Sequence, residues 1–358
     1  MFNSLKYQDW LLNLAMLILA AASLLTIKSA DASLFTSQLV WFVLAFLLIF
    51  VLAQIDWRPI LNYRWIIVGG YLLVLGLLLL TLAFAPVIRE SKSWLVLGPV
   101  RFQTAELAKV GLIIILAYFF AKRHIGIARL KTLFLSFFYF AAPAALILLQ
   151  PDWGSVLVLF GLWVGFLLVS GISWRHLFIG FFLTVLVAFL GWNFFLADYH
   201  KERIIGFLEP SYDPLGVNYS VIQAKIAIGS AGFLGRGFLQ GTQTQLGFLT
   251  EPATDFIFAA FTEEWGFLGA ALVIAALIIV VLRIVRIGLL SANNFSQFIS
   301  LGTAMLLLWE FILNIGSNLG LSPVVGVTFP FLSYGGSSLL TKAVLVGIIQ
   351  SIAVRNKL

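Results

Sequence analysis

The residue best suited to chemistry in this chain is Asp255. It stands between a long polar segment, 197–254, and a long apolar stretch. A carboxylate beside membrane hydrocarbon is costly, and such residues usually line water-filled cavities where chemistry or transport occurs. A second interpretation is structural, because Asp is also favoured as the N-cap or in the first turn of a helix. At this point both interpretations of Asp255 stay open.

Three more acids fall inside apolar stretches. Glu263 and Glu264 follow Asp255 by eight and nine residues, and Glu310 lies in the middle of another apolar stretch. Acids in such places are hard to explain as solvated surface if the stretches cross a membrane. We therefore expect a polar cavity between helices.

Basic residues near the starts of apolar stretches are candidates for binding an anion. Glu106 and Lys109 are three residues apart and share one face of a helix. They form either a simple ion pair or a site where Lys109 meets an anionic group. Lys342 follows the run Ser-Tyr-Gly-Gly-Ser-Ser at 333–338. The amides and dipole at such a helix start attract an anion, although the same run is typical of an ordinary helix start.

The elements that carry these residues are membrane-spanning helices. The chain is 61% hydrophobic and only 10% charged, whereas soluble domains carry about 25% charged residues. Stretches of about 17–25 apolar residues mark spanning helices. They occur at 11–27, 37–55, 65–86, 106–121, 132–149, 154–170, 177–196, 256–282, 297–319 and 338–354. The predicted fold class is therefore all-α, a polytopic membrane protein with ten transmembrane helices in a single domain, 1–358.

The longest external segment, 197–255, separates the seventh and eighth predicted helices. It is far too long for a simple connection, and long loops of this kind usually carry function. Within it, 218–228 is predicted to form a short helix, and 229–241 contains five glycines that permit tight backbone paths.

The distribution of Lys and Arg predicts the orientation in the membrane. The short loop 122–131 carries four of them and is predicted to be cytoplasmic, as are both termini, which puts Asp255 at the outer face. The net charge of +7 follows from this topology and indicates no nucleic-acid partner. Because the chain has no Cys and its three His never cluster, the sequence indicates no disulfide, thiol nucleophile or zinc site.

Several segments together resemble one family. They are Phe102-Gln103-x-x-Glu106-Leu107-Ala108-Lys109, Gln150-Pro151-Asp152-x-Gly154-Ser155, Asp213-Pro214-Leu215-Gly216, Gln223-Ala224-Lys225-Ile226-Ala227-Ile228-Gly229-Ser230, Gly241-Thr242-Gln243-Thr244-Gln245-Leu246, Thr254-Asp255-Phe256-Ile257-Phe258-Ala259 and Pro330-Phe331-x-Ser333-Tyr334-Gly335-Gly336-Ser337-Ser338. In this order, on a ten-helix frame, they closely resemble the SEDS family (shape, elongation, division, sporulation). The run at 241–245 is more similar to the elongation branch of that family than to its division branch.

The chain departs from the family pattern in two places. The family usually has Pro-Glu-x-His-Thr-Asp before the eighth helix, but here Thr250 replaces the Pro and Ala253 replaces the His. A proton relay through that His is therefore absent, which leaves Asp255 as the obvious base of the motif. The family also tends to place Arg before Trp94, where this chain has Ser93.

The resemblance implies a peptidoglycan glycosyltransferase that polymerises lipid II, a polyprenyl-diphosphate-linked disaccharide peptide, at the outer face of the bacterial plasma membrane. Asp255 is then expected to be the general base that takes the proton from the acceptor sugar hydroxyl. Cations and helix starts near the diphosphate would stabilise the charge that develops there. The residues expected to bind the substrate are Lys109, Glu106, Arg101, Trp94, Arg236, Ser337, Ser338 and Lys342.

The sequence indicates no definite cofactor. A divalent cation at the diphosphate, with Asp152 or Glu106 as a ligand, stays open. The partner that the resemblance implies is a class B penicillin-binding protein, which would supply a transpeptidase. Two other functions also stay open. One is a flippase for lipid II, whose site would belong near the membrane midplane, and the other is a non-catalytic scaffold of an elongation complex.

Overall fold

The protein is described by a computed structural model that covers residues 7–86, 92–98, 100–123, 130–194, 198–209 and 211–356. Most of the predicted cytoplasmic loop, 124–129, lies outside these residues. Inside a bilayer a segment must satisfy its own backbone hydrogen bonds, so apolar stretches fold as helices. The long apolar helices are α2 (Trp10–Ala30), α3 (Ala32–Gln54), α5 (Arg64–Phe84), α6 (Thr104–Ala121), α7 (Leu130–Leu148), α8 (Trp153–Val169), α9 (Trp174–Phe194), α13 (Ile257–Leu289), α14 (Asn294–Leu319) and α15 (Gly336–Asn356).

Each of the ten predicted stretches coincides with one of these helices, which confirms the all-α polytopic fold class. Among the described residues, nine helices are long and apolar enough to cross a membrane. The remaining helix, α8, is apolar but has 17 residues. The number of ten spanning helices therefore stays a prediction.

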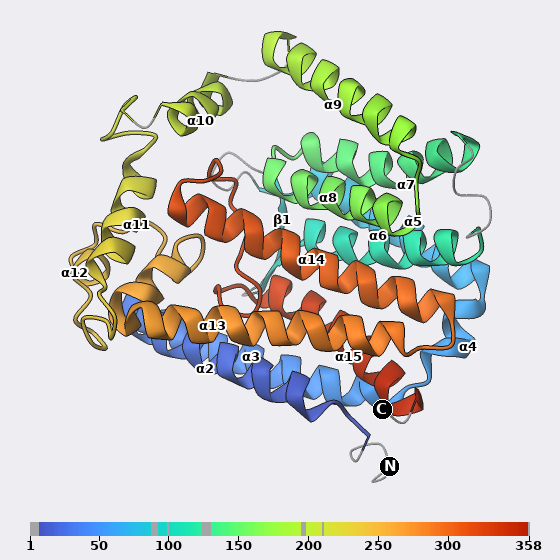
Figure 1. Ribbon diagram of the computed structural model, residues 1–358, viewed down its shortest axis with the longest axis horizontal. Coiled ribbons are helices and arrows are strands. Elements are labelled where there is room, and N and C mark those ends of the chain that lie inside the picture. Colours follow the sequence, from blue (N-terminus) through green and yellow to red (C-terminus); the bar gives the residue numbers. More distant parts are fainter. Residues whose placement is uncertain are drawn as a thin grey trace.

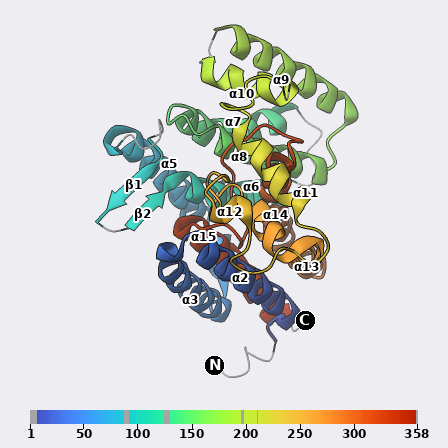
Figure 2. The ribbon, with the colours of Figure 1, turned by 90° about the vertical axis from the view of Figure 1, so that its left-hand side faces the viewer.

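The helices form a bundle around α15 (Figure 1). Most side chains of α15 are buried, and it packs against α3, α6, α13 and α14. In contrast, α9 lies at the edge of the bundle with its described side chains largely exposed (Figures 1 and 2).

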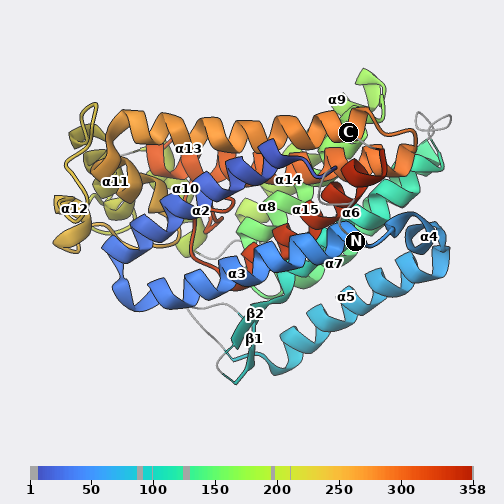
Figure 3. The ribbon, with the colours of Figure 1, turned by 90° about the horizontal axis from the view of Figure 1, so that it is seen from below.

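The start of α2 and the end of α15 lie at the same end of the bundle, where the Asp9 amide donates to Gln350 Oε1 over 2.9 Å. Figure 3 shows the other end, occupied by the segment that connects α9 to α13.

The described part of that connecting segment is folded. It contains α10 (Asp198–Leu208), α11 (Tyr219–Ser230) and the short α12 (Thr242–Gln245). The predicted helix at 218–228 is confirmed by α11. The glycine-rich stretch after α11 packs against an interruption in α13 at Gly266, which has φ +68° and ψ −173°. Gly232 and Phe233 accept hydrogen bonds there from Phe267 and Leu268, over 3.1 and 3.2 Å, so the interrupted backbone keeps its partners.

A small hairpin is the one described departure from an all-helical chain. Strands β1 (Trp94–Leu97) and β2 (Val100–Gln103) pair antiparallel, with Trp94 opposite Gln103. Gln103 Nε2 donates to Asp152 Oδ2 over 2.8 Å, which holds the base of the hairpin at the start of α8. Figure 2 shows the hairpin projecting at one side of the bundle, just before α6 begins.

Candidate active site

Asp255 lies in the turn that leads into α13, with its backbone held by two amide side chains. The Asp255 carbonyl accepts hydrogen bonds from Asn314 Nδ2 at 3.0 Å and from Asn318 Nδ2 at 2.9 Å. Both asparagines are buried on α14. Because a carbonyl held from two sides cannot rotate freely, the position of this half-buried residue is set by α14.

The interpretation of Asp255 as a helix cap is wrong. The N-cap of α13 is Phe256, and the first turn contains no acid. Asn318 Oδ1 accepts a hydrogen bond from the Ala259 amide over 3.1 Å, so one of the first free amides of α13 is satisfied from a neighbouring helix. The structural role that the sequence suggested for Asp255 thus belongs to Asn318.

The loop after α14 passes directly beside Asp255. Ser333 Oγ donates to the Thr254 carbonyl over 2.7 Å, and Asn314 Nδ2 also donates to the Val327 carbonyl over 2.8 Å. Gly326 in this loop has φ +68°, and a Cβ at this position would lie 3.9 Å from Asp255 Oδ2. A positive φ favours glycine. Because Gly326 has no side chain, the backbone of the loop lies close to the Asp255 carboxylate.

Four charged side chains from three helices form a buried group that we call the four-charge cluster: Glu106, Lys109, Glu310 and Lys342. Lys109 Nζ lies 2.8 Å from Glu106 Oε1 and 2.8 Å from Glu310 Oε1. Lys342 Nζ lies 2.9 Å from Glu310 Oε2, in an ion pair without hydrogen-bond alignment. Two acids and two bases balance, which is what makes their burial among apolar helices tolerable.

The four-charge cluster is joined to the loop beside Asp255. Lys342 Nζ donates to Ser338 Oγ, and Ser338 Oγ lies 3.2 Å from Thr328 Oγ1. Thr328 is two residues from Gly326. The cluster therefore supports the loop that approaches the carboxylate, through a chain of polar contacts.

The predicted substrate-binding residues separate into two groups. Glu106, Lys109, Ser338 and Lys342 are brought together, and Ser337 is buried beside them in the first turn of α15. The two lysines are engaged by carboxylates in this structure, so they do not present an open anion site.

The other three predicted residues lie outside that group. Trp94 and Arg101 are on the hairpin, Trp94 half-buried and Arg101 exposed. Arg236 is exposed in the glycine-rich stretch, where its amide donates to the Glu263 carbonyl over 3.0 Å. No described contact joins Arg236 to Asp255.

Glu263 and Glu264 are buried and hydrogen-bonded, so they do not line the polar cavity that we expected between the helices. Glu263 accepts hydrogen bonds from the Gln243 amide at 2.8 Å and from the Thr244 amide at 3.2 Å. Glu264 accepts one from the Leu239 amide at 3.2 Å. These acids hold the folded external segment against α13, because buried loop amides need acceptors.

Sequence reasoning missed the asparagines of α14. Glu310, Asn314 and Asn318 follow one another at intervals of four residues, which places them on one face of the helix. That spacing was a readable sign of a polar face directed at the bundle interior.

The candidate metal ligands are occupied by other partners. Asp152 is the N-cap of α8 and accepts from the Ser155 amide at 3.0 Å as well as from Gln103. Glu106 is paired with Lys109. Within the described ranges, no group of three or more His, Asp and Glu side chains is arranged to hold a metal ion.

Fold and site together define a polytopic α-helical membrane protein with a half-buried carboxylate at the end of its bundle, next to paired buried charges. Residues 4–358 match the family model described as "Cell cycle protein", which covers FtsW, RodA and SpoVE. The chain belongs to this family, as the resemblance of its motifs predicted.

Named relatives and solved structures agree with this assignment. The chain is 36% identical over 354 residues to the peptidoglycan glycosyltransferase MrdB of Escherichia coli (strain K12), covering 97% of this chain and 93% of that protein. It is 34% identical over 294 residues to the probable peptidoglycan glycosyltransferase FtsW of Thiomicrospira cyclica, covering 80% and 74%.

Two solved structures are similar over nearly their whole length. One, from work on the structural coordination of polymerization and crosslinking by a peptidoglycan synthase complex, has a TM-score of 0.84, 32% identity and 98% coverage of both chains. The other, the rod shape determining protein RodA of Thermus thermophilus, has a TM-score of 0.72 and 28% identity, covering 97% and 96%.

Proposed function

We propose that this protein is a peptidoglycan glycosyltransferase of cell elongation that polymerises lipid II, with Asp255 as its general base. Relatives that bear the enzyme's name support the reaction. The observation that carries the role of Asp255 is its placement: a half-buried carboxylate at the end of the bundle, on a backbone held by Asn314 and Asn318. A positioned base contributes about 10²–10⁴-fold to a rate.

The reaction needs one proton transfer and one displacement. The Asp255 carboxylate takes the proton from the 4-hydroxyl of the acceptor GlcNAc as the hydroxyl oxygen attacks the anomeric carbon of the donor sugar. The bond from that carbon to the diphosphate oxygen breaks, and the diphosphate leaves with the bonding electrons. The anomeric centre inverts in a single step, so one base suffices and no covalent enzyme intermediate forms.

Basic residues assist the departure of the diphosphate in two different ways. Arg101 is exposed on the hairpin and is the cation that contacts the diphosphate directly. Lys109 and Lys342 act indirectly, because their carboxylate partners balance their charge and Lys342 supports the loop beside Asp255 through Ser338. A preorganised positive charge near a developing anion lowers the barrier.

A divalent cation at the diphosphate is part of the proposal. It would be held by the substrate's phosphate oxygens together with few protein groups, since Asp152 and Glu106 are already engaged. Chelation with EDTA should stop strand formation, and Mg²⁺ or Mn²⁺ should restore it. Unchanged activity in EDTA would remove the cation from the mechanism.

Orientation follows from the two ends of the bundle. The end of α6 and the start of α7, which flank the loop with four basic residues, lie at the end of the bundle that also holds the start of α2 and the end of α15 (Figure 3), and we place this end at the cytoplasm. Asp255 is at the opposite end and faces outward. A class B penicillin-binding protein supplies the transpeptidase, in line with a solved relative studied as part of a peptidoglycan synthase complex.

The test is strand formation by purified protein in detergent, with lipid II and the partner supplied. The wild type should form glycan strands, and Asp255→Ala and Asp255→Asn should lose at least ~10²-fold in rate. Glu202→Gln, a change of an exposed acid in the same external segment, is the matched control. If neither the wild type nor any variant forms strands, the enzyme proposal fails and the result favours the flippase function. If Asp255→Ala forms them normally, Asp255 is not the base.

A further inference from the structure

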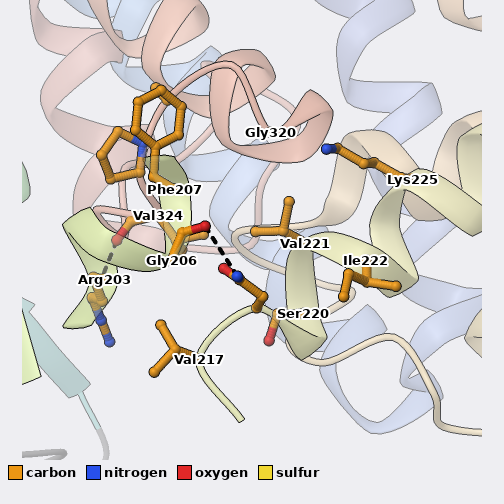
Figure 4. A pocket seen from close by; sticks show the side chains of 13 residues that line it. Arg203, Gly206, Phe207, Val217, Ser220, Val221, Ile222, Lys225, Gly320 and Val324 are labelled. Carbon is orange, nitrogen blue, oxygen red and sulfur yellow. Dashed lines mark hydrogen bonds between the residues drawn. The ribbon is translucent and has the colours of Figure 1, made fainter. Parts of the chain in front are cut away.

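A cavity of about 120 Å³ lies between α10, α11 and the loop that follows α14 (Figure 4). Its wall includes Arg203 of α10, Lys225 of α11 and, from the loop, Pro323 and Val324. Figure 4 shows the two basic side chains on opposite sides of the pocket. None of the residues predicted from the sequence to bind substrate lines it, so it is distinct from the four-charge cluster.

No carboxylate of the described residues matches the positive charge of Lys225 in this cavity. Of the described residues that line it, two are basic and none is acidic. Lys225 forms no ion pair with any described residue. Its ammonium is directed at Gly320, where a Cβ would lie 2.5 Å from Nζ. The nearby carboxylate of Asp213 is used by the amides of Gly216 and Val217, at 3.1 and 3.2 Å.

Specific contacts build the walls. Asn218 is buried, and its Nδ2 donates to the Gly206 carbonyl at 3.0 Å and to the Tyr212 carbonyl at 2.9 Å. These bonds hold the end of α10 against the start of α11, and a Cβ at Gly206 would lie 2.7 Å from Asn218 Oδ1. Arg203 Nη1 donates to the Val324 carbonyl over 3.2 Å and so fixes the loop side.

The lining identifies the class of ligand. Phe207, Val221 and Ile222 add apolar surface beside the two cations. Ser220 Oγ accepts a hydrogen bond from Thr250 Oγ1 at 2.6 Å, which leaves its own proton available to donate. The volume equals that of about four water molecules at ~30 Å³ each. Cations, a hydroxyl donor and apolar walls on this scale suit an organic carboxylate about the size of an amino acid.

The cavity lies within reach of the proposed base. Val324 is two residues before Gly326, and two residues of extended chain span at most about 7 Å. A Cβ at Gly326 would lie 3.9 Å from Asp255 Oδ2. One substrate molecule can therefore place its reacting sugar at Asp255 and an attached anionic group in the cavity.

We propose that this cavity binds a carboxylate of the peptide carried by the glycan substrate, with Lys225 as the contacting cation. The inference rests on the proposed function and adds peptide recognition to it. The substrate's other anion, the diphosphate, shares the same oxyanion chemistry, so the experiment must separate the two sources.

The experiment measures initial rates of strand formation against substrate concentration, for two substrates. One is lipid II with its full peptide, and the other is the same lipid-linked disaccharide with the peptide replaced by a methyl amide. Lys225→Met should raise KM about tenfold for the peptide-bearing substrate, the loss expected for one charge-assisted hydrogen bond, with kcat unchanged. Wild type and variant should have equal KM for the peptide-free substrate.

Two further variants control for general damage. Lys225→Arg should recover most of the affinity, because it keeps the charge. Lys131→Met removes an exposed lysine at the other end of the bundle and should change nothing. Size-exclusion profiles must match the wild type.

Two kinetic results would overturn the inference. An equal rise in KM for both substrates assigns the cavity to the diphosphate, and no rise for either removes it from substrate binding. If the wild type forms no strands, the proposed function fails first. Binding of a soluble muramyl peptide to wild type and Lys225→Met then tests, independently of activity, whether the cavity binds the peptide. Equal binding to both proteins overturns the inference.

Discussion

Neutralising Glu310 should destabilise the protein through the four-charge cluster. Glu310 Oε1 lies 2.8 Å from Lys109 Nζ, and Oε2 lies 2.9 Å from Lys342 Nζ. Glu310→Gln keeps the shape and one acceptor but changes the cluster from neutral to one net positive charge, with two buried ammonium groups facing Glu106 alone. Removing one partner of a buried pair costs about 3–5 kcal/mol. We expect the lower end, about 3 kcal/mol, because glutamine still accepts one hydrogen bond.

A double variant tests whether charge balance is the reason. Glu310→Gln combined with Lys342→Met removes one acid and one base, leaving Glu106 and Lys109 as a neutral pair. The double variant should recover about 2 kcal/mol of the loss, since residues in one network couple by about 0.5–3 kcal/mol. The free energy of unfolding is measured by titrating sodium dodecyl sulfate into mild-detergent micelles.

The control is Glu202→Gln, an exposed acid that should change the free energy of unfolding by less than about 0.5 kcal/mol. The reasoning is refuted if Glu310→Gln is as stable as the wild type. It is equally refuted if the double variant loses the sum of the two single losses, because the charges would then act independently.

Two further changes probe the surroundings of Asp255. Gly326→Ala forces a side chain into φ +68°, at a cost of about 1–2 kcal/mol, and brings a methyl group to 3.9 Å from the carboxylate. Strand formation and thermal stability should both fall, whereas Gly76→Ala, which meets no atom within 4 Å inside α5, should be neutral or stabilising. Asn318→Ala removes the hydrogen bonds to Ala259 and to the Asp255 carbonyl, so stability should drop by about 1–2 kcal/mol in the same titration. The rate of strand formation should drop by a larger factor than in core variants of equal stability that lie away from Asp255. An unchanged rate would mean that Asn318 does not position the base.

The helices were predictable because each depends on local composition. A continuous apolar stretch has one stable backbone arrangement in a bilayer, and all ten stretches coincide with helices of the structure. The short helix α11 and the tight glycine-rich path after it were predictable for the same local reason. The family motif Thr-Asp-Phe-Ile also singled out Asp255, because this motif can be read from the sequence alone.

The partners of the charged residues could not be predicted from local spacing. Lys109 and Glu106 are neighbours on one helix, and that pair was anticipated. Lys109 and Glu310 are 201 residues apart and meet only because α6 and α14 pack together. For the same reason the sequence assigned Glu263 and Glu264 to a cavity, although they bind the amides of a folded loop.

By itself the sequence determined the class, the family, the positions of the helices and the identity of the candidate base. Tertiary structure alone decided what each polar group does. It gave the capping role to Asn318, joined Lys342 through Ser338 to the loop beside Asp255, and opened a basic cavity around Lys225. The physical reason is that hydropathy and helical periodicity report only neighbours within a few residues. The energy of a buried charge depends on partners that packing brings from distant helices.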